Sequence, residues 1–188
     1  MKFFILSCCA LVFIAAVEIN QAAHAEQTPE VTALIDRADI ENLMVDYYSH
    51  IGDSTFDFSR YFVPDGVLDV NGLVATGAEE IHALYVRAGG GAGAVPPAQD
   101  PGAPPPGMFI MQLTNLKIDV AGDTATAEMF WSSVESETLI SQPRVTEYGT
   151  DQTELVKLNG SWLIRHRVVT SGGGMPEGLL ESYMNRKR

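Results

Sequence analysis

The sequence predicts an α+β protein in which a curved antiparallel sheet packs against about three N-terminal helices. In the first half of the chain, apolar residues recur at helical spacing, most clearly between Glu30 and Ile51. From Met108 onward the apolar pattern changes to a period of two, which is typical of strands. Because helices come first and hairpin-linked strands follow, the strands are expected to form one sheet with helices against it.

Three helices are predicted. The first spans Glu30 to Ile51, with Thr28 as its N-cap and Pro29 in its first turn. A short second helix is expected from Phe56 to Phe62, and it ends before Pro64. The third spans Gly77 to Arg87 and carries three apolar residues on one side, Ile81, Leu84 and Tyr85.

Strands are expected where the alternation is clear and turn residues bound it. Val67–Val70 and Leu73–Thr76 flank an Asn71-Gly72 hairpin turn, and Val63–Gly66 has turn chemistry. Four longer strands follow: Phe109–Asp119, Thr124–Thr138, Val145–Leu158 and Ser161–Thr170.

Residues Gly89–Gly107 are almost entirely Gly, Pro and Ala, so this segment cannot contribute to a packed core. Two interpretations remain open, namely a disordered insertion and a lid over a pocket.

Residues 1–25 have the layout of a secretory signal peptide. Lys2 supplies the positive region, Phe3–Val17 the apolar region, and Ala23-His24-Ala25 a small-residue cleavage site. The mature chain is therefore expected to begin near Glu26 and to be secreted or periplasmic, with its folded domain over residues 26–175 and a C-terminal tail over 176–188. Both cysteines lie within the leader, so the mature chain would form no disulfide.

The formal net charge of −12 argues against binding to nucleic-acid backbones and anionic membrane surfaces, which attract basic clusters. No cofactor or metal is expected, because no two histidines have ligand spacing and the Gly runs lack the Lys of a phosphate-binding loop.

Asp53 is the first candidate for catalysis. It follows the apolar stripe of the first predicted helix, directly after the helix-ending residue Gly52. A carboxylate near a helix C-terminus and an apolar pocket should have a raised pKa, as a general base requires. The alternative is that Asp53 begins a solvated loop.

Several segments together resemble the SnoaL-like branch of the nuclear-transport-factor-2-like superfamily. They occur in the family's order over nearly all of the mature chain: Tyr48–Asp53, Tyr61–Asp69, Gly77–Ile81, Thr114–Leu116, Gly122–Ala127, Trp131, Tyr148 and Asn159–Arg167. The resemblance implies a cone-shaped domain with an apolar pocket between the curved sheet and the helices. The superfamily includes scytalone dehydratase and polyketide cyclases beside many non-catalytic modules, so the fold alone does not decide the function.

In the dehydratase members, the Asp after the first helix pairs with a His on a strand. Asp53 matches the Asp position, but Met111 occupies the His position. Any chemistry would then need another partner for Asp53, and the candidates are His50 and His166. His166 is expected to share a strand face with Trp162 and Ile164, which point into the cone in this family.

Tyr48, Met111, Trp131 and Tyr148 are the expected pocket walls, and core packing is the alternative for each. Three functions remain open. In the first, the chain is a cofactor-independent lyase or isomerase that acts on a small hydrophobic carbonyl compound, with Asp53 as general base. Alternatively, it binds an apolar small molecule without catalysis, or it is an assembly module whose sheet face pairs with a partner, as in superfamily homo-oligomers.

Overall fold

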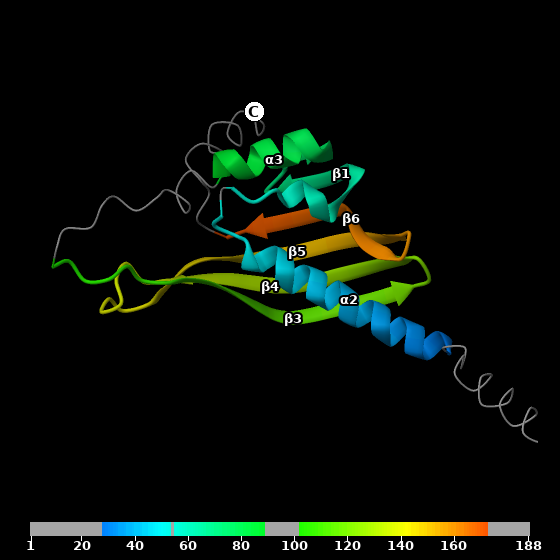
Figure 1. Ribbon diagram of the computed structural model, residues 1–188, viewed down its shortest axis with the longest axis horizontal. Helices are drawn as coiled ribbons and strands as arrows, with labels where there is room; N and C mark the ends of the chain where they lie inside the picture. Colours follow the sequence, from blue (N-terminus) through cyan, green and yellow to red (C-terminus); the bar gives the residue numbers. More distant parts are fainter. Residues whose placement is uncertain (1–27, 54, 89–101, 173–188) are drawn as a thin grey trace, which may run out of the picture.

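A computed structural model describes residues 28–53, 55–88 and 102–172. Two α-helices, one 3-10 helix and six strands succeed one another along this part of the chain (Figure 1). Their bounds are α2 Pro29–Ser49, η2 Phe58–Tyr61, β1 Phe62–Val70, β2 Leu73–Thr76, α3 Gly77–Ala88, β3 Phe109–Ala121, β4 Thr124–Glu135, β5 Arg144–Leu158 and β6 Ser161–Ser171.

The six strands form one sheet in the order β2-β1-β6-β5-β4-β3. Four of the five neighbouring pairs are antiparallel, as expected, but β1 and β6 are parallel. This pair joins the first part of the chain to the last, so a hairpin does not connect its strands. The α+β class and the curved sheet are confirmed.

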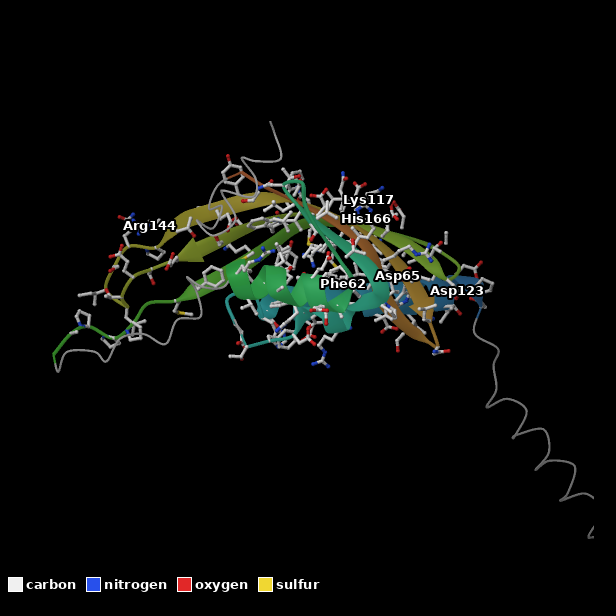
Figure 2. All side chains as sticks on the ribbon, turned by 90° about the horizontal axis from the view of Figure 1, so that it is seen from above. Phe62, Asp65, Lys117, Asp123, Arg144 and His166 are labelled. Carbon is white, nitrogen blue, oxygen red and sulfur yellow. The ribbon has the colours of Figure 1, made fainter. Side chains whose placement is uncertain are left out.

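The sheet is arched, and the helices lie on its concave side (Figure 2). α2 crosses β3, β4 and β5, whereas α3 lies beside β1 at the other end of the sheet (Figure 1). The core fills the space between these layers. Among the described residues, seven hydrophobic side chains are fully buried in it: Ile40, Met44, Tyr47, Leu68, Ile81, Ala127 and Ile164.

The predicted N-cap of α2 is confirmed, because Thr28 Oγ1 accepts a hydrogen bond from the backbone N–H of Val31 at 3.4 Å. Further along the helix, buried Asp36 accepts hydrogen bonds from Lys157 Nζ at 2.5 Å and from Trp162 Nε1 at 3.1 Å. These bonds fix α2 against β5 and β6, and thereby position the end of the helix.

The segment after α2 differs from the expectation in two places. The predicted helix Phe56–Phe62 is only a single 3-10 turn, η2, in which the Asp57 side chain accepts a hydrogen bond from Ser59 N. The turn predicted at Val63–Gly66 lies inside β1, where the register with β6 shifts. Pro64 lacks an N–H for the ladder, and a strand accommodates such a residue at an irregularity.

Some expectations fall outside the described residues. They are the signal peptide, most of the Gly- and Pro-rich segment, namely 89–101, and the C-terminal tail. Within the described ranges, no helix is both long enough and apolar enough to cross a membrane.

Candidate functional site

A buried ion pair lies on the concave face of the sheet. Arg167 on β6 and Asp151 on β5 are both 1% exposed, and the distance from Arg167 Nη2 to Asp151 Oδ2 is 2.5 Å. Two hydroxyl groups also donate to the carboxylate: Tyr48 at 2.8 Å and Thr153 at 2.6 Å. Asp151 therefore has the several partners that a buried charge requires.

Aromatic rings enclose the guanidinium of Arg167. Its Cζ lies 3.7 Å from the centroid of the Tyr47 ring and 4.9 Å from that of Tyr48. The hydroxyl of Tyr47 is in turn hydrogen-bonded to that of Tyr85 on α3. Burial raises the pKa of each of these three tyrosines, so all three hydroxyls stay protonated. Burial opposes the charge of Arg167, but the Asp151 carboxylate raises its pKa well above the ordinary value.

A β-bulge explains why Arg167 faces inward. Ile164 pairs with Leu155 and His166 pairs with Glu154, so β6 has one extra residue, Arg165, at this point. Ile164 and Arg167 are consequently both on the inner face, where both are buried.

The expectation that His166 shares a face with Trp162 and Ile164 is wrong for the same reason. Simple alternation predicts that face, but the extra residue reverses the alternation beyond Ile164. Figure 2 shows His166 with Lys117 on the side of the sheet away from the helices. The imidazole therefore does not reach the concave side.

Trp131 lies on the inner face, but Tyr148 does not. Trp131 pairs with Gly149, and a Cβ at Gly149 would come within 2.8 Å of Trp131 Cε2, so the indole covers this glycine. Tyr148 precedes Gly149, points to the outer face and is 61% exposed. It does not line the concave side, because adjacent residues of a strand face opposite ways.

Met111 and Tyr48 both lie on the concave side, as expected. Met111 pairs with Ser133 on the inner face and packs, partly buried, against the hydrophobic core. Tyr48 is 5% exposed and packs near the end of α2.

Asp53 does not have the electrostatics expected of it. The residue is exposed, and its Oδ1 accepts hydrogen bonds from Thr55 Oγ1 at 2.6 Å and Thr55 N at 2.9 Å. These bonds lower the pKa of the Asp53 carboxyl, whereas the sequence argument expected a raised value. α2 ends at Ser49 and Gly52 turns the chain with φ +98°, so Asp53 lies in an exposed turn beyond the helix.

His50 also has partners other than Asp53. Its Nδ1 lies 2.8 Å from the backbone oxygen of Asp46, and its ring stacks on Phe56 with 3.7 Å between centroids. His50 therefore ends α2 as a half-buried C-cap residue. Its backbone oxygen accepts a hydrogen bond from Asp53 N–H at 3.0 Å, but among the described residues no hydrogen bond joins its imidazole to the Asp53 carboxylate.

Glu147 is a second carboxyl group on the concave face. It pairs with Ser133 and lies two strands from Met111 in the same row of the sheet. Ser171 Oγ donates to Glu147 Oε1 at 2.5 Å, yet burial raises the pKa of this carboxyl. A carboxyl with a raised pKa in a partly buried position is a candidate for proton transfer.

Three inner-face N–H groups are buried without a hydrogen-bond acceptor among the described residues. They are Arg167 Nε, Arg167 Nη1 and Trp131 Nε1. Such groups cost about 1–3 kcal/mol each when they stay unpaired, so they are suited to receive an oxygen atom of a ligand.

Two other features do not contribute to this site. In the described part of the chain, no three His, Cys, Asp or Glu side chains are placed to hold a metal ion. An open groove of about 770 Å³ lies between β2 and α3, with Val74, His82 and Arg87 among its lining residues, and contains none of the expected site residues.

Sequence reasoning missed Asp151, Arg167 and Glu147. Alternation along β5 could have placed Asp151 on the face of Leu155, because Asp151, Thr153 and Leu155 follow a strict period of two. Arg167 could not be found in this way, since the bulge has no clear signal in the sequence.

Fold and site together define an α+β domain whose concave sheet carries buried polar groups among aromatic rings. The chain belongs to the SnoaL-like domain family, whose model matches residues 32–168. No curated protein is similar enough in sequence to match the chain.

Several solved structures share the fold at low sequence identity. An Asp-to-Asn variant of a protein of unknown function from Mycobacterium tuberculosis is 19% identical, with a TM-score of 0.61 and 78% of each chain covered. A proposed scytalone dehydratase from Novosphingobium aromaticivorans is 20% identical, with a TM-score of 0.54 and coverage of 73% of this chain and 85% of that one. A protein from Catenulispora acidiphila in complex with S-DNPA is 18% identical, with a TM-score of 0.57 and coverage of 73% and 94%.

Proposed function

We propose that the chain is exported, that its concave face binds a small apolar molecule carrying an acceptor oxygen, and that the chain acts on this molecule as a cofactor-independent lyase or isomerase. The observation that supports this most strongly is the buried guanidinium of Arg167, with two N–H groups that lack an acceptor among the described residues. A ligand oxygen would satisfy them, and the rings around them would pack against its apolar part.

The proposal of a lyase or isomerase is supported by the family match and by the similarity of the fold to a proposed scytalone dehydratase. An oxygen held by Arg167 would develop negative charge when a proton leaves the neighbouring carbon, and a fixed cation stabilises that charge. Asp53 is the base that the family resemblance suggests, although its exposure and lowered pKa make it a weak one.

Non-catalytic binding is the second candidate. Two points favour it: the family resemblance puts Met111 at the position of a histidine, and among the described residues no hydrogen bond joins the Asp53 carboxylate to an imidazole. In that case the same donors on the concave face would hold the ligand without chemistry.

The binding proposal can be tested by titrating 2-naphthol into the protein in a calorimeter. Trp131→Phe keeps an aromatic ring but removes the indole N–H donor. Arg167→Met removes the two guanidinium donors, Nε and Nη1. Each is expected to weaken binding about tenfold or more, the usual effect of losing a hydrogen bond to a charged or buried group. Arg165→Met, at the outward-facing bulge residue, is the matched control. Absence of binding to the parent protein would refute the proposal.

The catalytic role of Asp53 needs a separate test. If Asp53 is the base, Asp53→Asn should lower kcat by about a hundredfold or more on any substrate that the parent turns over. If turnover is unchanged, another group transfers the proton.

A further inference from the structure

We infer that Glu147 is the group that moves the substrate proton on the concave face. The inference rests on the proposed function and assigns its base. It starts from the position of the carboxyl, which lies in the row Met111–Ser133–Glu147 across β3, β4 and β5. Neighbouring strands are about 4.8 Å apart, so Glu147 projects about 10 Å from Met111, the position at which the family resemblance implies a histidine.

Glu147 and Arg167 both lie on the inner side of the sheet. Asp151, which holds the guanidinium of Arg167, is four residues further along β5, a separation of about 13 Å between Cα atoms. On the inner face of β5, Gly149 is the one residue between the two carboxylates, and the indole of Trp131 on β4 covers it. Trp131 itself is only 6% exposed, so the proposed ligand is a conjugated compound of one or two rings that spans the distance between the two groups, with its oxygen at Arg167 and a C–H bond near Glu147.

The surroundings of Glu147 suit a base. Its Oε1 accepts a hydrogen bond from Ser171 Oγ, which orients the carboxylate. The buried hydroxyl of Ser133, which pairs with Glu147 in the sheet, is hydrogen-bonded to the hydroxyl of Thr146 at 2.9 Å. Burial raises the pKa of Glu147, which makes its carboxylate a stronger base and brings this pKa closer to that of a carbon acid.

Few charges face Glu147 in the described part of the chain. On the inner face of β5 and β6 the nearest are Asp151 and Arg167, which neutralise each other. Towards the open end, Arg144 pairs with Glu137 at 2.8 Å, and both are well exposed. Met111 and Leu113 on β3 carry no charge.

The proposed step is balanced within the substrate and the protein. The Glu147 carboxylate accepts a proton from a carbon conjugated with a carbonyl group, and the C–H electron pair passes through the conjugated double bonds onto the carbonyl oxygen at Arg167. The resulting carboxylic acid then returns the proton to another carbon, or to a leaving group, which restores the carboxylate. No external oxidant or cofactor is needed.

The test uses 5-nitrobenzisoxazole, a planar apolar compound. A base removes its C–H proton, its N–O bond breaks, and a coloured cyanonitrophenolate forms. The parent protein should show saturable turnover, faster than an equal concentration of acetate, that 2-naphthol inhibits. Glu147→Gln should lower kcat at least about tenfold with KM nearly unchanged. For the parent, kcat should rise with pH through a single ionisation, as expected for a carboxylate base.

Glu154→Gln is the matched control, because Glu154 lies on the same strand but on the exposed outer face. It should leave both constants unchanged, and Glu147→Asp should retain part of the activity. If turnover is saturable but Glu147→Gln equals the parent, or if Asp53→Asn alone abolishes it, the assignment of Glu147 is wrong and the binding proposal stands. If 2-naphthol neither binds nor inhibits, the proposed function itself fails.

Discussion

Arg167 is the residue whose burial has the greatest consequence for the site. Its charge is fully buried, and its stability depends on Asp151 and on the rings of Tyr47 and Tyr48. A charge in such a position is costly unless it is paired, so the fold and the site depend on the same contacts.

Arg167→Met is therefore expected to lower the free energy of unfolding by about 3–5 kcal/mol, because it leaves the Asp151 carboxylate buried without its counter-ion. Urea denaturation would measure this loss. The double variant Arg167→Met/Asp151→Leu should be more stable than the single variant, since the unpaired charge is gone. Arg165→Met, the exposed neighbour, should change stability by less than about 0.5 kcal/mol. Equal losses for Arg165→Met and Arg167→Met would contradict this view.

Glu147 should make stability depend on pH in a defined direction. Its pKa is raised by burial, so the folded state binds the proton more tightly than the unfolded state. The stabilisation is complete below the unfolded pKa of about 4.3 and is lost as pH rises through the higher folded value. Compared with the parent, Glu147→Gln should therefore gain stability between pH 5 and 8, measured by urea denaturation at each pH. A parent curve parallel to that of the variant would contradict the raised pKa.

At the scale of the elements, one extra residue in β6 determines which side chains line the site. The bulge at Arg165 puts Arg167, rather than His166, on the concave face. From Glu147 to Leu155, β5 alternates strictly, which carries Glu147, Gly149 and Asp151 along one face, whereas its register with β4 shifts at Thr146, directly before Glu147.

The bulge leads to a prediction about deletions. Removing Arg165 leaves Ile164 and Arg167 facing inward, because His166 then separates them in a regular ladder. The cost should be modest, about 1–2 kcal/mol, with the near-ultraviolet circular dichroism of the buried aromatic residues retained.

The matched deletion is Val168, in the regular part of the same strand. It would turn Val169 and Ser171 to the outer face and break the hydrogen bond between Ser171 and Glu147. This variant should lose more stability than the deletion of Arg165. If the two deletions lower the stability equally, the bulge does not determine which side chains of β6 lie on the concave face.

At the scale of the whole molecule, periodicity predicted the fold class and almost every element. Thr28 as N-cap and the Asn71-Gly72 turn were correct because local chemistry alone determines them. The parallel pairing of β1 with β6 depends on contacts across the whole chain, which no local pattern encodes.

The candidate site was harder to predict from sequence than the fold. Alternation along the strand placed Met111 on the concave side, and the family resemblance suggested Tyr48 and Trp131, which also lie there. Asp53 was assigned a raised pKa from the helix dipole, but a side-chain turn with Thr55 dominates its electrostatics. Short-range hydrogen bonds outweigh a partly screened dipole at an exposed position.

The outer face of the sheet supports the remaining prediction, that the chain forms a homo-oligomer. Exposed apolar side chains gather on the outer side of three neighbouring strands: Ile110 on β3, Phe130 on β4 and Tyr148 on β5, at 45%, 52% and 61% exposure. An apolar group of this kind on an otherwise polar surface is typical of a protein contact. We expect a symmetric dimer that joins two such faces.

Sedimentation velocity at about 50 µM should show the dimer for the parent, and Phe130→Glu should sediment as a monomer because a charge at the centre of the contact opposes burial. Val74→Glu is the control, since Val74 is 56% exposed on β2, away from β3–β5. Phe130→Glu should still bind 2-naphthol, because Phe130 and the buried donors lie on opposite faces of the sheet. If the parent is monomeric at this concentration, the prediction of a dimer is wrong. If Phe130→Glu loses naphthol binding, the two faces of the sheet are not independent.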